Sequence, residues 1–254
     1  MLKNRVIPSL LLKNGGLVKT TKFSKPTYVG DPINAIKIFN DKEVDELMVL
    51  DIVASKQGRD PDYHMIEMFA SECFMPLCYG GGIKSIEQAG TLFSLGVEKL
   101  TIQTSALIDL DLIAGIAARY GNQSVVVSID VKKSYFGDYQ MYSSANEKVI
   151  KRNWLGFLNQ AIEAGAGEIL INAVDRDGTL SGMDLKLIGE ASKESTVPLI
   201  AAGGVGSLND IKLAVHAGAN AIAVGAFFVY HGPHRAVLIS YPKYKELENL
   251  FKEI

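Results

Sequence analysis

The sequence is poor in cysteine and histidine, and it contains only two cysteines and four histidines in 254 residues. Cys73 and Cys78 are too few for a disulfide framework and lack the spacing of metal ligands. We therefore expect a reducing compartment, the cytoplasm, and two buried thiols. The histidines are scattered along the chain, so the sequence indicates no metal site and no cofactor.

Excess charge and long apolar runs are also missing. A net charge of −2 provides no concentrated basic face for nucleic acid or for an anionic membrane. The apolar stretch at residues 6–12 has no small-residue cleavage site, so it predicts a first strand rather than a signal peptide. No stretch approaches the roughly 18 apolar residues of a membrane helix. We expect neither a nucleic-acid partner nor a membrane partner.

Short apolar runs, each followed by a turn and an amphipathic segment, recur along the chain and indicate repeated βα units. Eight runs have the length and composition of strands: residues 6–12, 46–52, 75–78, 99–102, 125–130, 168–173, 198–201 and 221–224. Capping residues mark the helices, with Asp31, Ser85 and Ser207 at their starts and Gly96, Gly165 and Gly218 at their ends. The sequence predicts an α/β protein with one domain, residues 1–254, folded as a (β/α)8 TIM barrel.

An internal repeat indicates that this barrel consists of two duplicated half-barrels. Residues 76–105 align without gaps on residues 198–227, and the first strand aligns on the fifth, with Leu11 opposite Asp130. We place the half-barrels at residues 1–121 and 122–254. An extra segment at residues 134–150, rich in Tyr, Gly and Ser, predicts a β-ribbon over the top face.

The C-terminal ends of barrel strands form the active site in this fold, and glycine pairs follow two of them. Gly81 and Gly82 follow the third strand, and Gly203 and Gly204 follow the seventh. Glycines there let backbone N–H groups and a helix N-terminus approach a phosphate, although either pair alone could serve only a tight turn. The duplication predicts two phosphate half-sites on one substrate. Further candidates follow the neighbouring strands: Gln103, Thr104, Gly178, Gly225 and Ala226.

Carboxylates at two strand ends are candidates for acid–base catalysis. Asp130 ends the fifth strand, and Asp177 lies in the polar run that follows the sixth. Partial burial would raise the pKa of either group toward neutrality. Alternatively, the polar run after the sixth strand has only a structural role, in which Asp175 and Arg176 form a surface ion pair and Asp177 caps a turn.

Over almost the whole chain, these motifs resemble the cyclase subunit of imidazole glycerol phosphate synthase, the barrel half of a glutamine amidotransferase in histidine biosynthesis. The resemblance is carried by Arg5-Val6-Ile7, Lys13 through Lys19, Gly30-Asp31-Pro32, Leu50-Asp51-Ile52, Gly80-Gly81-Gly82-Ile83, Val127-Ser128-Ile129-Asp130, Asp175-Arg176-Asp177-Gly178-Thr179 and Gly203-Gly204. It implies a glutaminase partner at the N-terminal face, a ligand with two phosphates, and substrate contacts from Lys19 and Asp51. It also implies a gate for ammonia formed by Arg5, Glu46, Lys99 and Glu168. Those four residues could instead form a salt-bridged plug that stabilises the barrel.

The resemblance breaks at one catalytic position. The family pattern implies an acid–base aspartate on the first strand as well as the sixth, and here Leu11 stands on the first. Gln103, Asn172 and Ala202 also differ from the usual residues. This selective loss resembles paralogues associated with amidation of surface-polysaccharide sugars, in which ammonia reaches a third protein, a sugar amidotransferase.

Three hypotheses follow from this comparison. The chain conducts ammonia for sugar amidation, or it is an active cyclase in which Asp130 or a water replaces the missing acid. In the third, it is a non-catalytic scaffold that activates a glutaminase.

Overall fold

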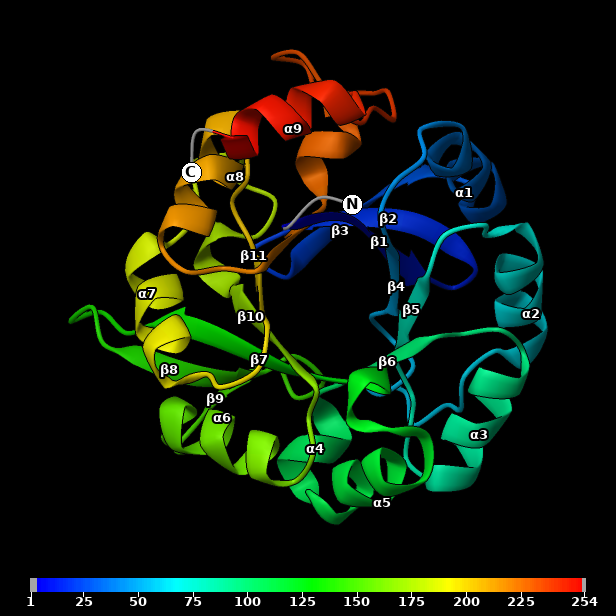
Figure 1. Cartoon of the computed structure of the whole chain (residues 1–254), viewed down its shortest axis with the longest axis vertical. Coiled ribbons are helices and arrows are strands. Elements are labelled where there is room, and N and C mark those ends of the chain that lie inside the picture. Colours follow the sequence, from blue (N-terminus) through cyan, green and yellow to red (C-terminus); the bar gives the residue numbers. More distant parts are fainter. Residues whose placement is uncertain (1–3, 253–254) are drawn as a thin grey trace.

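The computed structural model describes residues 4–252 and contains a closed barrel of parallel strands (Figure 1). The barrel strands are β1 (Arg5–Lys13), β4 (Leu47–Asp51), β5 (Leu77–Gly80), β6 (Lys99–Ile102), β7 (Val125–Lys133), β10 (Glu168–Ala173), β11 (Leu199–Ala202) and β12 (Ala221–Val224). Each pairs with the next in parallel, and β12 pairs with β1 to close the barrel. The predicted (β/α)8 fold is confirmed. β5 and β11 begin later than predicted because Pro76 and Pro198 precede them and have no N–H for a ladder hydrogen bond.

Helices surround the barrel, and three of them begin where the sequence predicts (Figure 1). They are α1 (Pro32–Asp41), α2 (Tyr63–Glu72), α3 (Ile86–Ser94), α4 (Thr104–Ile108), α5 (Asp111–Tyr120), α6 (Trp154–Glu163), α7 (Leu185–Glu194), α8 (Leu208–His216) and α9 (Tyr244–Lys252). The side chains of Asp31, Ser85 and Ser207 accept N-cap hydrogen bonds at α1, α3 and α8. Within residues 4–252, no helix is long and apolar enough to cross a membrane.

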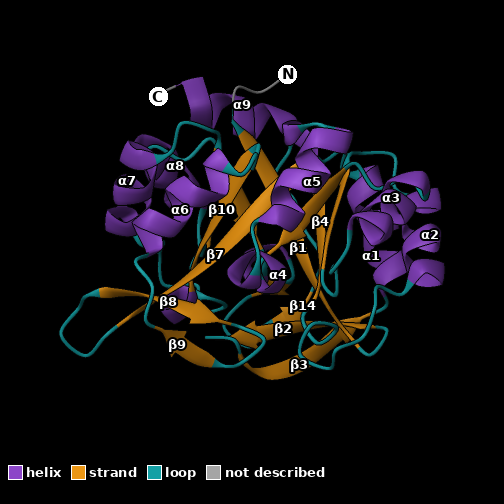
Figure 2. Cartoon of the chain, turned by 90° about the horizontal axis from the view of Figure 1, so that it is seen from below, coloured by secondary structure: helices purple, strands orange, loops and turns teal. Residues whose placement is uncertain are grey.

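Two antiparallel ribbons extend from barrel strands over the C-terminal end of the barrel, opposite α9 (Figure 2). β2 (Gly16–Thr21) and β3 (Ser24–Gly30) continue from β1, while β8 (Tyr139–Ser143) and β9 (Lys148–Ile150) continue from β7. The second ribbon occupies the segment expected to form one. The first was missed, although Asn14-Gly15 is a strong hairpin signal and both residues have positive φ. A further hairpin, β13 (Tyr230–His231) and β14 (Ala236–Val237), precedes α9.

The apolar core has two parts, one between the barrel and the helices and a smaller one inside the bore. The bore is packed by side chains that include Ile7, Met48 and Leu170, together with Cys78. Cys73 is only half-buried, contrary to expectation, because it follows the last residue of α2 at the molecular surface. Within residues 4–252, no group of His, Cys, Asp and Glu side chains is arranged to hold a metal ion.

Candidate active site

A cavity of about 820 Å³ lies at the C-terminal end of the barrel, beneath the two ribbons. Most of the predicted site residues line it: Leu11, Lys19, Asp51, Gly81, Gln103, Thr104, Asp130, Asp177, Gly178, Gly203, Gly204, Gly225 and Ala226. Gly82 is absent from the lining, and its N–H donates to Ser55 Oγ at 3.1 Å. The structure therefore brings together residues that the sequence spreads over more than two hundred positions.

Asp130 is a buried carboxyl with few polar neighbours. Its side chain accepts a hydrogen bond from Gln103 Nε2, and Gln103 Oε1 accepts one from Ser144 Oγ at 2.5 Å. Burial raises the pKa of Asp130 to about 7, and the charge of Asp177 acts in the same direction. Asp130 can therefore exist in both protonation states near neutral pH. Sequence reasoning missed Ser144, which the ribbon formed by β8 and β9 supplies.

Asp177 is held by the other ribbon. Its Oδ2 accepts hydrogen bonds from Thr20 Oγ1 at 2.7 Å and from Phe23 N at 3.3 Å. Burial raises the pKa of Asp177, while these hydrogen bonds and the charge of Lys19 oppose the rise. The contacts tie the end of β10 to the ribbon that covers it, and neither Thr20 nor Phe23 could be identified from the sequence alone.

Lys19 provides a buried cation near the end of β12, the eighth strand of the barrel. Its Nζ donates to Ser9 O at 2.5 Å and lies close to Gly225. Burial lowers the pKa of Lys19 to about 8, although Asp177 partly offsets this effect. An anion bound nearby would therefore favour the charged amine.

The cavity wall around Leu11 is apolar. Leu11 pairs with Leu50 on β4, and both line the cavity together with Ala202. A leucine side chain carries no exchangeable proton, so this wall cannot supply acid–base catalysis.

The glycine turns are required by the backbone as well as suited to phosphate. Gly81 has φ +124°, and a Cβ there would lie 2.5 Å from Asp51 O. Gly203 has φ +96°, and a Cβ there would lie 2.7 Å from Ala173 O. Close strand packing alone therefore explains both residues.

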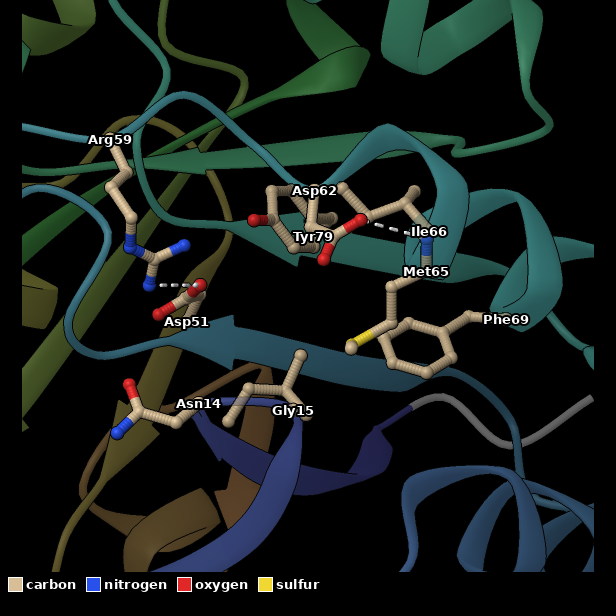
Figure 3. A pocket seen from close by; sticks show the side chains of 10 residues that line it. Asn14, Gly15, Asp51, Arg59, Asp62, Met65, Ile66, Phe69 and Tyr79 are labelled. Carbon is tan, nitrogen blue, oxygen red and sulfur yellow. Dashed lines mark hydrogen bonds and ion pairs between the residues drawn. The ribbon is translucent and has the colours of Figure 1, made fainter.

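Asp51 is largely occupied by its own loop. Its Oδ1 accepts hydrogen bonds from Val53 N and Ala54 N, each at 3.0 Å, and Oδ2 faces Arg59 at 3.4 Å. Asp51 lines the main cavity and also a smaller side cavity between β4, β5 and α2 (Figure 3).

Asp175 and Arg176 do not form the alternative surface ion pair. Asp175 Oδ2 accepts a hydrogen bond from Lys133 N at 2.7 Å, and Arg176 Nη1 donates to Ser181 O at 3.2 Å. These contacts fold the segment after β10 against its neighbours, which indicates a structural role for both residues.

Four charged side chains meet at the N-terminal end of the barrel. Arg5 pairs with Glu46 and, at 2.9 Å, with Glu168. Lys99 pairs with both carboxylates at 3.0 Å. We call these four residues the charged ring. One oxygen of each carboxylate, Glu46 Oε1 and Glu168 Oε2, is buried without a hydrogen-bond partner among residues 4–252.

Comparison with known proteins gives the family. A family model described as histidine biosynthesis protein matches residues 5–234. The chain belongs to this family. It is 53% identical over 249 residues to imidazole glycerol phosphate synthase subunit hisF2 of Pseudomonas aeruginosa, a name given there as provisional, with 98% of this chain and 99% of the relative covered. The corresponding subunit HisF of Streptococcus sanguinis is 39% identical over 211 residues, covering 83% of this chain and 84% of the relative. The resemblance to the barrel subunit of this synthase, and the enzyme class it implies, are confirmed.

Proposed function

We propose that this chain is the ammonia-conducting barrel of a glutamine amidotransferase of the imidazole glycerol phosphate synthase type, serving amidation of a surface-polysaccharide sugar. The observation that carries the proposal is Leu11 in the wall of an otherwise equipped cavity. Lys19 and the glycine turns line this cavity and remain available to hold a ligand with two phosphates, while Asp177 remains as an acid–base group. A binding assay with equal affinities for ligands bearing one and two phosphates would contradict the two half-sites.

In this proposal, ammonia enters through the charged ring from a glutaminase docked on the N-terminal face. The ring lies at the starts of β1, β4, β6 and β10, and the cavity lies at the opposite ends of the same strands. Paired charges close the entrance to water and ions, so the ion pairs have to separate for transfer. A third protein, a sugar amidotransferase, would receive the ammonia at the cavity end.

Leu11 separates this role from cyclase chemistry. Loss of one general acid–base group lowers a rate by about 10²–10⁴-fold, whereas it leaves phosphate contacts and an ammonia path in place. The chain would therefore retain a ligand-binding cavity with little cyclase activity of its own.

An active cyclase in histidine biosynthesis is the second candidate, and Asp130 is the observation that favours it. Its pKa of about 7 suits a group that both donates and accepts a proton near neutral pH. In this reading, Asp130 takes over the role of the missing strand-one acid.

Turnover of the histidine-pathway substrate with ammonium salts distinguishes the two candidates. We expect a rate about 10²–10⁴-fold below that of an ordinary family member, and a rate within about tenfold would establish the cyclase instead. Leu11→Asp should raise the rate. Leu11→Asn, whose side chain has the shape of aspartate but no titratable proton, should not.

The ammonia path is tested separately by narrowing the bore at Ala221, which is fully buried in the inner cluster. Cells that carry Ala221→Leu should lose amidated sugar from their surface polysaccharide, whereas cells with the smaller Ala221→Ser should retain it. Retention in both, with the glutaminase complex intact, would favour a scaffold without ammonia transfer.

A further inference from the structure

The side cavity has the composition of a second ligand site. It measures about 250 Å³ and lies outside the barrel wall, between β5, α2 and the turn from β1 to β2. Its apolar lining comes from Leu12, Met65, Ile66 and Phe69. The volume is below the range of about 300–1,000 Å³ that is typical of drug-sized ligands, so it suits a molecule of few atoms.

Tyr79 is the buried polar group of this cavity. Its side chain is 2% exposed, yet its hydroxyl makes no hydrogen bond to any residue in 4–252. Burial raises the pKa of the phenol, and the charges of Asp51 and Asp62 act in the same direction. The hydroxyl thus stays protonated and can both donate and accept. The hydroxyl is not among the fully enclosed polar atoms that lack a partner, so it keeps accessible surface in the cavity, where a ligand atom can hydrogen-bond with it.

Two opposite charges stand at the more exposed side of the cavity. Asp62 caps α2 through Oδ1, which accepts from Met65 N at 3.1 Å, and this leaves Oδ2 available. Arg59 donates through Nε to Gln57 and through Nη2 to Asp51, and this leaves Nη1 available. In Figure 3 the head groups of Arg59, Tyr79 and Asp62 lie along one side of the cavity, with Met65 on another.

We propose that this cavity binds an α-amino acid whose side chain ends in a hydrogen-bonding group. The ammonium group pairs with Asp62 Oδ2, and the carboxylate accepts from Arg59 Nη1. The side chain lies against the apolar walls, and its polar end meets the Tyr79 hydroxyl. No residue of the charged ring lines this cavity, whereas Asp51 lines both it and the main cavity.

Calorimetric titration of the isolated chain tests the proposal with three probes. L-glutamine carries all three groups, L-norleucine lacks the polar end, and 4-carbamoylbutanoate lacks the ammonium group. We expect L-glutamine to bind with a Kd on the order of 1 mM, and each of the other two to bind about tenfold more weakly. No saturable binding of L-glutamine at ~10 mM, or binding of all three probes with equal affinity, would overturn the proposal.

Two variants with matched controls identify the contacts. Tyr79→Phe should lower the affinity for L-glutamine about tenfold and leave the affinity for L-norleucine unchanged. Tyr63→Phe, at a residue outside the cavity, should change neither affinity. Asp62→Asn keeps an N-cap side chain but removes the charge, so it should weaken both amino acids. Asp31→Asn makes the same change at the cap of α1 and should have no effect. If Tyr79→Phe lowers the affinities for L-glutamine and L-norleucine equally, the hydroxyl has a structural role and does not contact the polar end of the ligand.

Discussion

Replacing Asp130 by asparagine tests whether burial raises the pKa of this carboxyl in the main cavity. Asparagine is close in shape and can still accept the hydrogen bond from Gln103 Nε2, but it never ionises. The variant therefore removes the titration of one buried carboxyl and keeps its packing.

The magnitude follows from the pKa of Asp130, which rises from an ordinary 3.8 to about 7 on folding. Below pH 3.8 the Asp130 carboxyl is protonated in both the folded and the unfolded chain, and its contribution to the free energy of unfolding is complete. Between pH 3.8 and pH 7 this carboxyl is ionised in the unfolded chain but protonated in the folded chain, so the free energy of unfolding falls as pH rises. The full loss is about 4 kcal/mol, of which roughly 2.5 kcal/mol falls between pH 5 and pH 8.

Urea unfolding of both proteins at pH 5 and pH 8 measures this effect. Asp130→Asn should gain about 2.5 kcal/mol relative to the wild type between the two pH values. Asp138→Asn, which removes a carboxylate from the exposed turn of the β8 ribbon, should follow the wild type. If the free energies of unfolding of Asp130→Asn and the wild type differ by the same amount at both pH values, the pKa of Asp130 is not shifted and the acid–base argument fails.

Two further predictions concern the other charged groups. Because the pKa of Lys19 is about 8, its amine loses its charge between pH 7 and pH 9, and calorimetry should show the affinity for a ligand with two phosphates falling about tenfold over this range. Lys19→Met should abolish this pH dependence. If the affinity of the wild type does not change with pH, the phosphates bind away from Lys19. Lys99→Met leaves the two ring carboxylates with Arg5 alone and should lower the free energy of unfolding by about 1–3 kcal/mol in urea. The control, Lys37→Met at an exposed ion pair, should cost less than about 0.5 kcal/mol, and equal losses would mean that the ring contributes no more than a surface pair.

The barrel could be predicted from the sequence because its strands are buried on both faces and appear as continuous apolar runs. The first ribbon was harder to predict. Its Asn14-Gly15 turn carries a signal, but its second turn uses Lys22 and Phe23, both with positive φ and neither with a sequence preference for it. Tertiary contact with Asp177 holds this turn in place, and such a contact cannot be read from local sequence.

The main cavity lies where the predicted strand ends converge, because the fold fixes that position. The side cavity could not be predicted in this way. Tyr79 stands in an apolar strand and has the sequence environment of a core residue. Only the structure shows that its hydroxyl reaches a space with no partner among residues 4–252.

Under the proposed function, the main cavity would bind a phosphorylated ligand without an acid on the first strand, and its charge balance is compatible with this. Lys19 is the buried cation, and Asp130 and Asp177 are the nearby carboxyls whose pKa values burial raises. A carboxylate at position 11 would add a further negative charge to this space, and it would repel the phosphates of the proposed ligand strongly where burial excludes water. Leu11 removes that repulsion, so the same substitution that eliminates a proton donor favours retention of an anionic ligand. Under the proposed function, the cavity would therefore hold a phosphorylated molecule rather than transform it.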